Sequence, residues 1–307
     1  MPNLKDIKSR IQSVENTKKI TRAMKMVAAA KVKKAENSVK AGRPFSDELI
    51  KAFKKLLKAV SSSAPEGGNF KVAIENYPEL IKKREVKTAG LLVITSNKGL
   101  AGAYNANIIR NVLKQIVENN QNGIQSKLFI VGQKGISSLK RKEKELGFEI
   151  VKTYTQVANE ISAVGAEDIA HDLADNFVFG QIDSIEVFTT KFKNMMSYSA
   201  QKWELLPIKL EETETDELNI NPLMVFEPSQ QDILRKLVPL YITNTIYQAL
   251  LEAQASELAS RMTAMSAASN NAEDMIRTLT IDYNKARQSA ITQELLEVVS
   301  GADALKG

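Results

Sequence analysis

The sequence predicts an α/β fold in which the two ends of the chain form a long antiparallel two-helix coiled coil and an α/β domain is inserted between them. Three observations predict it. Two long windows near the ends contain neither glycine nor proline, their apolar and small residues follow heptad spacing, and strand and helix patterns alternate between them. We expect a coiled-coil helix over residues 1–60, an α/β domain over 61–228 and a second coiled-coil helix over 229–307.

The two terminal windows predict helices far longer than usual. They run from Asn3 to Ala41 and from Leu240 to Ser300, which correspond to helices of about 60 Å and about 90 Å. Such helices need each other, or another protein, to cover their apolar faces. The C-terminal window carries a heptad seam at Leu258, Met262, Met265, Ser269, Ala272, Ile276, Leu279, Tyr283, Ala286 and Ala290. The N-terminal window carries a similar stripe, with one compressed step, at Leu4, Ile7, Ile11, Val14, Thr17, Thr21, Met24 and Ala28.

The middle of the chain alternates between strand and helix signals. Strands are expected at residues 90–95, 127–132, 148–154 and, as the last strand, 184–192. Helices are expected between them at 105–118, 137–145 and 163–179. This alternation is typical of a mostly parallel sheet with helices on its faces.

Charge and composition restrict the classes of function. Residues 1–60 carry sixteen Lys/Arg and five Asp/Glu, a net charge of +11, whereas the whole chain has +6. The basic N-terminal arm indicates an acidic protein partner, a nucleic acid or an anionic membrane surface. The absence of cysteine excludes disulfides and thiolate chemistry, and no apolar run is long enough to span a membrane. The single histidine, His171, lies in a polar helical pattern and is interpreted as a solvated side chain.

Two glycine-containing turns resemble phosphate-binding loops only weakly. Ser96–Gly102 follows an expected strand and opens a helix, and Gly132–Gly135 follows the next strand. Neither turn has the spacing of a dinucleotide or P-loop fingerprint, so both are interpreted as tight strand-to-helix turns. We expect no cofactor, no metal and no catalytic residue, and the chain is predicted not to be an enzyme by itself.

Apolar residues are expected on surfaces that a two-helix pair leaves open. At Met24–Ala30, apolar and small residues occupy nearly the whole helix circumference. Because one partner helix covers about half of that circumference, an enclosing partner is indicated. A second apolar surface is expected at the C-terminal tip, formed by Leu295, Leu296, Val298, Val299, Ala302 and Leu305.

The motifs at both ends resemble those of ATP synthase gamma subunits. These are KSRIQSVENTKKITRAMKMVAAAKVKKA at 8–35, RMTAMSAASNNAEDMI at 261–276, YNKARQSAIT at 283–292 and ITQELLEVVSGADA at 291–304. The resemblance implies an antiparallel coiled coil with a Rossmann-like α/β domain at its base. It also implies a rotor of an F-type ATP synthase, turned by the c-ring, that drives the catalytic beta subunits through their states.

The resemblance further implies partners and residue roles. The partners would be three alpha and three beta subunits, the epsilon subunit and the c-ring, with membrane association only through the c-ring. The location would be the cytoplasmic face of a bacterial plasma membrane or another coupling membrane. Contacts with beta loops, or coupling between the helices, are implied for Met24, Lys25, Arg261, Arg287, Gln288, Thr292 and Glu294. An apolar bearing is implied for Leu295, Leu296, Val298, Val299 and Leu305, and c-ring contacts for Met224 and Glu227.

Two other functions stay open from the residues alone. A basic coiled-coil nucleic-acid-binding protein would explain the charged arm, and its binding would weaken steeply with salt. A nucleotide-binding enzyme built on the α/β domain would explain the two glycine turns. The first lacks aromatic stacking residues and a recognisable DNA-binding motif, and the second lacks a phosphate-binding fingerprint and a nucleophile.

Overall fold

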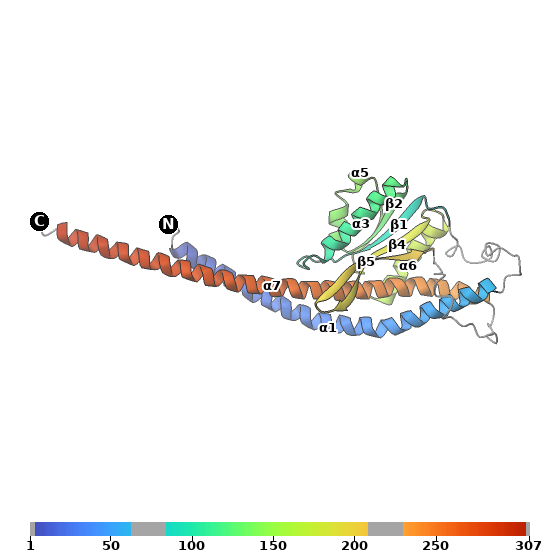
Figure 1. Ribbon diagram of the computed structural model, residues 1–307, viewed down its shortest axis with the longest axis horizontal. Helices are drawn as coiled ribbons and strands as arrows, with labels where there is room; N and C mark the ends of the chain where they lie inside the picture. Colours follow the sequence, from blue (N-terminus) through green and yellow to red (C-terminus); the bar gives the residue numbers. More distant parts are fainter. Residues whose placement is uncertain (1–3, 63–83, 208–229, 305–307) are drawn as a thin grey trace. The chain divides into compact units, whose positions relative to one another are not determined.

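A computed structural model describes residues 4–62, 84–207 and 230–304. The chain divides into two compact units, one formed by Met1–Ala30 with Arg261–Gly307 and the other by Lys31–Ser260. We call them the coil unit and the sheet unit. The two long helices, α1 (Leu4–Ser62) and α7 (Gln230–Ala304), each run through both units and are antiparallel (Figure 1). This arrangement confirms the expected fold class.

Both helices continue past residues that usually end a helix. Pro44 lies inside α1 and Pro239 inside α7. Pro44 is exposed, so its ring is accommodated on the solvent side of α1. Gly42 leaves room for the Gln248 side chain of α7, since a Cβ there would lie 2.6 Å from its Oε1.

The sheet has five strands in the order β3-β2-β1-β4-β5. Their bounds are β1 Thr88–Ile94, β2 Gln125–Val131, β3 Glu149–Tyr154, β4 Ser184–Asn194 and β5 Ser197–Leu206. The pairs β1–β2, β1–β4 and β2–β3 are parallel, and β4–β5 is antiparallel. The central strands read as continuous apolar runs because both of their faces are buried.

Helices cover both faces of this sheet. One face, with Leu91 and Val93, packs on α3 (Tyr104–Gln121) and α4 (Gln133–Leu139). The other face, with Leu92 and Ile94, packs on α6 (Ala163–Val178) and on α7, and Phe53 of α1 joins the same cluster. The part of α7 from Gln230 to Ser260, which we call the base of α7, is therefore a core element of the sheet unit.

Two expectations for the α/β domain are wrong. The strand at 184–192 is not the last, because β5 pairs with it as an antiparallel edge strand whose half-exposed residues give a weak apolar signal. The helix expected at 137–145 is instead divided into α4 and the short α5 (Glu143–Leu146). The break at Lys140–Lys142 lets Glu143 accept a hydrogen bond from the Ile150 amide at 3.1 Å, and Gly147 ends α5 with a φ of 69°.

Both glycine-containing segments form strand-to-helix turns, as the sequence predicts, but they differ in detail from a two-glycine turn. In Ser96–Gly102, the left-handed residues are Leu100 (φ 61°) and Gly102 (φ 52°), whereas Gly99 is not left-handed. Gly132 has a φ of 92°, and a Cβ there would clash with the carbonyl group of Thr95. Thr95 Oγ1 also accepts the Gly135 amide at 2.9 Å, so these glycines let β1 and β2 end side by side.

The coil unit confirms the C-terminal heptad seam. From Met262 to Ala290, every expected seam position is buried or half-buried, whereas most other positions are exposed. On α1 one expected position is wrong, because Thr17 is exposed and Lys18 takes its place in a regular spacing of three and four. The aliphatic stem of a lysine packs along a seam while its ammonium group reaches solvent, and here Lys18 Nζ pairs with Glu273 Oε1 at 3.3 Å.

Candidate partner-binding site

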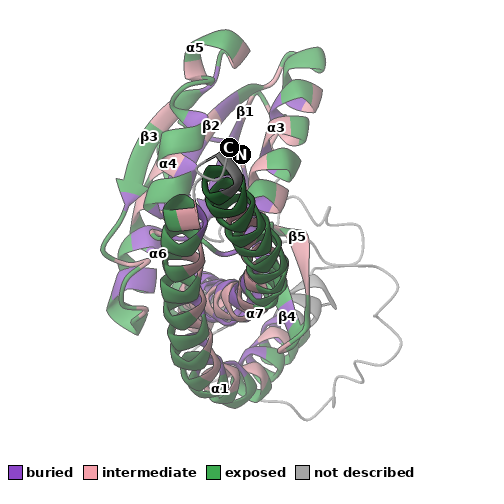
Figure 2. Cartoon of the chain, turned by 90° about the vertical axis from the view of Figure 1, so that its left-hand side faces the viewer, coloured by how far each residue is buried: buried purple, intermediate pink, exposed green. Residues whose placement is uncertain are grey.

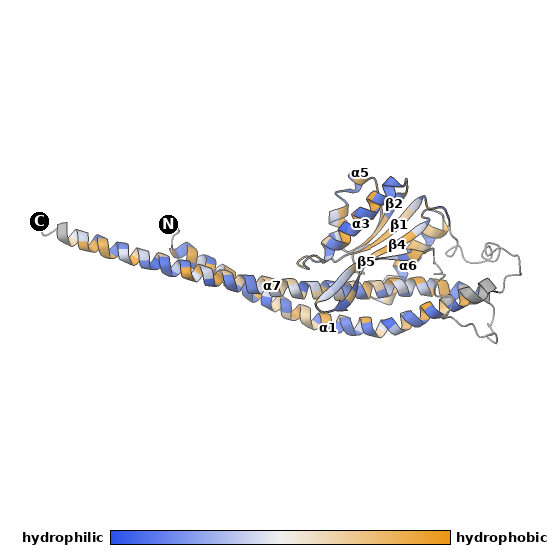
Figure 3. Cartoon of the chain, in the orientation of Figure 1, coloured by the Kyte–Doolittle hydropathy of each residue, from blue (hydrophilic) through white to orange (hydrophobic). Residues whose placement is uncertain are grey.

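The outer face of the coil unit exposes large apolar side chains. On α1 these are Ile20, Met26 and Val27, and on α7 they are Met275, Ile281 and Ile291. They lie away from the heptad seam that the two helices bury against each other. Figure 3 shows hydrophobic positions continuing along the terminal part of α7. Exposed apolar side chains of this size are suited to burial by a partner protein.

The C-terminal tip of α7 extends beyond the start of α1. Leu4 lies as many residues before Lys18 on α1 as Arg287 lies after Glu273 on α7. Because the helices are antiparallel, the Lys18–Glu273 contact therefore places Leu4 opposite Arg287. The following turns of α7 therefore have no α1 residue opposite them among the described residues. All residues from 291 to 302 are exposed, as Figure 2 shows for the helix end nearest the viewer.

The expected bearing residues lie on this tip. Leu295, Leu296, Val298 and Val299 are each more than half exposed, with Val298 at 70%. Leu305 lies outside the described residues, as do the expected c-ring residues Met224 and Glu227.

The expected beta-contact residues fall into two groups. Met24 and Lys25 are half-buried on α1, and Arg261 is half-buried on α7. Arg287, Gln288, Thr292 and Glu294 are exposed within about two turns of α7, next to the tip. Within this second group the Thr292 hydroxyl donates to the Gln288 backbone carbonyl at 2.9 Å.

Within residues 4–62, 84–207 and 230–304, titratable side chains gather beside β3 in the sheet unit. An open hollow beside β3 is lined by Lys152, Tyr154, Glu167, Asp168, His171 and Asp172. Burial, with a hydrogen bond to Asp172 at 2.7 Å, raises the pKa of the Tyr154 phenol and keeps it neutral. His171 is exposed and contacts Asp175 at 3.2 Å, which agrees with the prediction that its side chain is solvated. In these same ranges no cluster of three or more metal-binding side chains occurs, and none of the helices has the length and apolarity needed to span a bilayer.

Comparison with known proteins identifies the family. A family model described as ATP synthase matches residues 3–305. A protein named ATP synthase gamma chain from Picosynechococcus sp. is 41% identical over 332 residues, which cover 99% of this chain and all of that protein. The chain belongs to the family of ATP synthase gamma chains. A second gamma chain, from Gloeothece citriformis, is 40% identical with the same coverage.

Solved structures support the gamma-chain fold. A chain of the Tetrahymena thermophila mitochondrial ATP synthase central stalk and c-ring structure is 30% identical, with a TM-score of 0.60 over 81% of this chain and 99% of that chain. A chain from the Euglena gracilis mitochondrial ATP synthase has a TM-score of 0.64 over 98% of this chain and 94% of that chain, at 16% identity. The second likeness concerns the fold alone.

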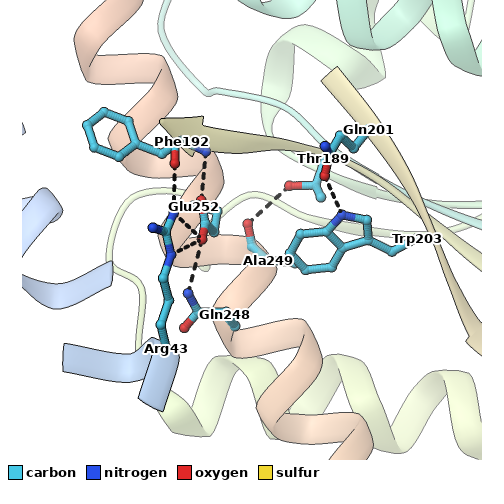
Figure 4. A network of polar contacts seen from close by, with 8 residues as sticks. All are labelled: Arg43, Thr189, Phe192, Gln201, Trp203, Gln248, Ala249 and Glu252. Carbon is cyan, nitrogen blue, oxygen red and sulfur yellow. Dashed lines mark hydrogen bonds and ion pairs between the residues drawn. The ribbon is translucent and has the colours of Figure 1, made fainter. Parts of the chain in front are cut away.

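The structure also shows a polar contact site in the sheet unit that was not predicted from the sequence. Arg43 on α1 forms an ion pair at 2.9 Å with Glu252 on α7, whose carboxylate is buried while the arginine side chain is partly exposed. The backbone of Phe192, near the end of β4, bonds to both side chains (Figure 4). One signal was available in the sequence, since Glu252 is a lone charge in the apolar stretch from Ala249 to Ala255. The partner, Arg43, is distant in sequence and is one of many basic residues in the N-terminal segment, so nothing in the sequence singles it out.

Proposed function

We propose that the chain is the central-stalk rotor subunit of an F-type ATP synthase, which couples ion-driven rotation of a c-ring to conformational cycling of catalytic beta subunits. Membership of the gamma-chain family over nearly the whole length supports this function. The observation that carries the mechanism is the exposed apolar surface of the coil unit, which extends from Ile20 and Val27 to the tip at Val298. A surrounding collar of other subunits would bury that surface.

In this mechanism the shaft acts by differential contact. Each orientation of an asymmetric shaft favours one conformation of each beta subunit, so rotation shifts the populations of their states in turn. Met24, Lys25, Arg261, Arg287, Gln288, Thr292 and Glu294 would supply contacts to beta loops or stabilise the helix pair. The bearing would include Leu295, Leu296, Val298, Val299 and Leu305, and Met224 and Glu227 would face the c-ring.

The chain would act without catalytic groups of its own, as a peripheral component held at the membrane through the c-ring. Its partners would be three alpha subunits, three beta subunits and the epsilon subunit. We place the complex at the cytoplasmic face of a bacterial plasma membrane. Family membership favours this role over nucleic-acid binding, which the basic N-terminal arm alone would also have explained.

The test is the variant Met24→Lys in the assembled, membrane-bound complex. An added cation beside Lys25 would strengthen contact with the acidic protein partner that the basic N-terminal arm indicates, and would oppose rotation past it. We expect proton pumping per ATP hydrolysed to fall about fivefold, the factor that corresponds to about 1 kcal/mol of added attraction. ATP hydrolysis should fall less. Both activities are measured on the same vesicles.

The matched control is Met196→Lys, which makes the same substitution at a methionine that is 88% exposed in the turn between β4 and β5. This variant should keep the ratio of pumping to hydrolysis. An equal loss of both activities in Met24→Lys would contradict the coupling role, as would a purified chain that fails to enter a complex with alpha and beta subunits.

A further inference from the structure

We propose that Arg43 and Glu252 are positioning residues that lock α1, α7 and β4 together in the sheet unit, so that torque passes between the α/β domain and both helices without slippage. This inference rests on the proposed rotor function. It assigns a mechanical role to an ion pair whose two residues both lie within the sheet unit.

All hydrogen-bond acceptor positions of the Glu252 carboxylate are occupied by donors from the protein. It accepts hydrogen bonds from Arg43 Nε at 2.9 Å and Arg43 Nη2 at 3.1 Å. It also accepts from the Phe192 amide at 2.7 Å and from Gln248 Nε2 at 3.2 Å. A carboxylate has about four acceptor sites, so these four donors saturate it. Three of the donors belong to Arg43 and Phe192, which lie on α1 and β4.

Arg43 forms a second direct link to the sheet. Its Nη2 donates to the Phe192 carbonyl at 2.7 Å, while its Nε and Nη2 hold Glu252. The planar guanidinium therefore spans the two helices and the strand end at once, a geometry that a lysine ammonium does not reproduce. Figure 4 shows Arg43 reaching from α1 to both the Glu252 carboxylate and the Phe192 backbone.

This node resists sliding in a way that apolar contacts do not. Hydrophobic packing is non-directional, so a small slide of α7 along the sheet retains much of it. A slide by one residue moves a helix by about 1.5 Å, which breaks hydrogen bonds that need donor-to-acceptor distances of about 2.7–3.2 Å. The Glu252 side chain is only 3% exposed, so the broken state would leave an unpaired buried charge.

Polar contacts on either side of the node act in the same direction. Toward the start of α7, Asn244 donates to Ser46 Oγ of α1 at 2.9 Å. Thr189 of β4 donates to the Ala249 carbonyl of α7 at 3.1 Å. Toward the end of the sheet unit, Ser260 donates to the Ala101 carbonyl at 2.6 Å and contacts Tyr198 of β5 at 3.0 Å. Polar contacts to α1 and to the sheet thus recur along the base of α7, with Glu252 as their charged member.

The experiment compares Arg43→Gln, Arg43→Lys and Lys51→Gln in the assembled membrane complex. Lys51→Gln is the matched control, since it neutralises a cation of α1 whose ion pair with Glu48, at 2.8 Å, stays within that helix. Loss of a charged hydrogen bond should raise the population of the slipped arrangement by a factor of about ten or more. In Arg43→Gln we therefore expect a severalfold lower ratio of proton pumping to ATP hydrolysis, normalised to the amount of assembled complex.

A second readout follows the lock itself. The peptide containing Phe192 should exchange its amide hydrogens faster in Arg43→Gln, because that amide donates to Glu252. Arg43→Lys should restore part of the ratio, and Lys51→Gln should match the wild type. If Arg43→Gln reduces only the amount of complex and leaves the ratio per complex unchanged, the residue is merely structural and the proposal is overturned.

Arg43→Lys decides the question if Arg43→Gln does not assemble. A lowered ratio with faster exchange at Phe192 then supports the lock, and a wild-type ratio overturns it. Failure of the rotor function itself would be seen separately, because the wild-type chain would then fail to assemble or to pump.

Discussion

The coil unit and the sheet unit use the same two helices in different ways. In the coil unit the helices meet along a narrow seam of small and apolar residues, such as Ala28 and Ala272, and expose large apolar side chains outward. In the sheet unit α7 becomes part of a hydrophobic core, and polar contacts such as the one between Arg43 and the buried Glu252 link α1 and α7 to the sheet. A narrow seam specifies pairing, whereas a core with buried polar contacts specifies position.

This difference has an energetic meaning. Much of the apolar surface of the coil unit would be buried only by a partner, so part of its stability would come from binding. The sheet unit buries its apolar residues within the chain, including Phe129 and Phe177, which are fully buried. The two units should therefore respond differently to mutation in the isolated chain, and three predictions test this.

The largest effect is expected for Phe129→Ala in the core of the sheet unit. Removing this fully buried ring should lower the free energy of unfolding by about 3–5 kcal/mol. The single tryptophan, Trp203 on β5, provides a fluorescence signal from this unit during urea denaturation. Met196→Ala, at an exposed position in the β4–β5 turn, is the control and should change stability by less than about 0.5 kcal/mol. Similar effects of both variants would show that the sheet unit does not have the rigid core described here.

A smaller effect is expected for Ala28→Leu in the seam of the coil unit. Ala28 is 2% exposed, so the larger side chain should overpack the seam and cost about 1–3 kcal/mol. The change should be visible in helical circular dichroism and absent from the Trp203 transition. Ala30→Leu, on the exposed side of the same helix, should leave both signals unchanged. A shift of the Trp203 transition by Ala28→Leu would mean that the two units unfold together.

Much of the coil unit could be predicted from the sequence because its contacts repeat. The seam positions on α7 follow directly from steps of three and four residues, and the exposed tip follows from apolar residues beyond the seam. The prediction is wrong at Thr17, because the alternation of three and four residues selects Lys18, which keeps its charge at the edge of the seam. Periodicity was the better guide there.

The sheet unit was predicted less completely because its decisive contacts are not local. The parallel strands were found from their apolar runs, but β5 is an edge strand with little apolar signal. The Arg43–Glu252 pair joins residues separated by 209 positions. No spacing rule relates them, so their contact depends on how α1, α7 and β4 come together.

The smallest effect is expected for the ion pair between Lys18 and Glu273 in the coil unit. Both side chains are partly solvated, and a double-mutant cycle with Lys18→Met and Glu273→Gln should give a coupling energy of about 0.2–1 kcal/mol. High salt should remove most of it, because the screening length falls to about 3 Å at 1 M. The same cycle with Arg43→Gln and Glu252→Gln should give a larger coupling energy with less salt dependence, since Glu252 is buried. Equal coupling energies for the two pairs would remove the distinction between a solvated contact in the coil unit and a position-fixing contact in the sheet unit.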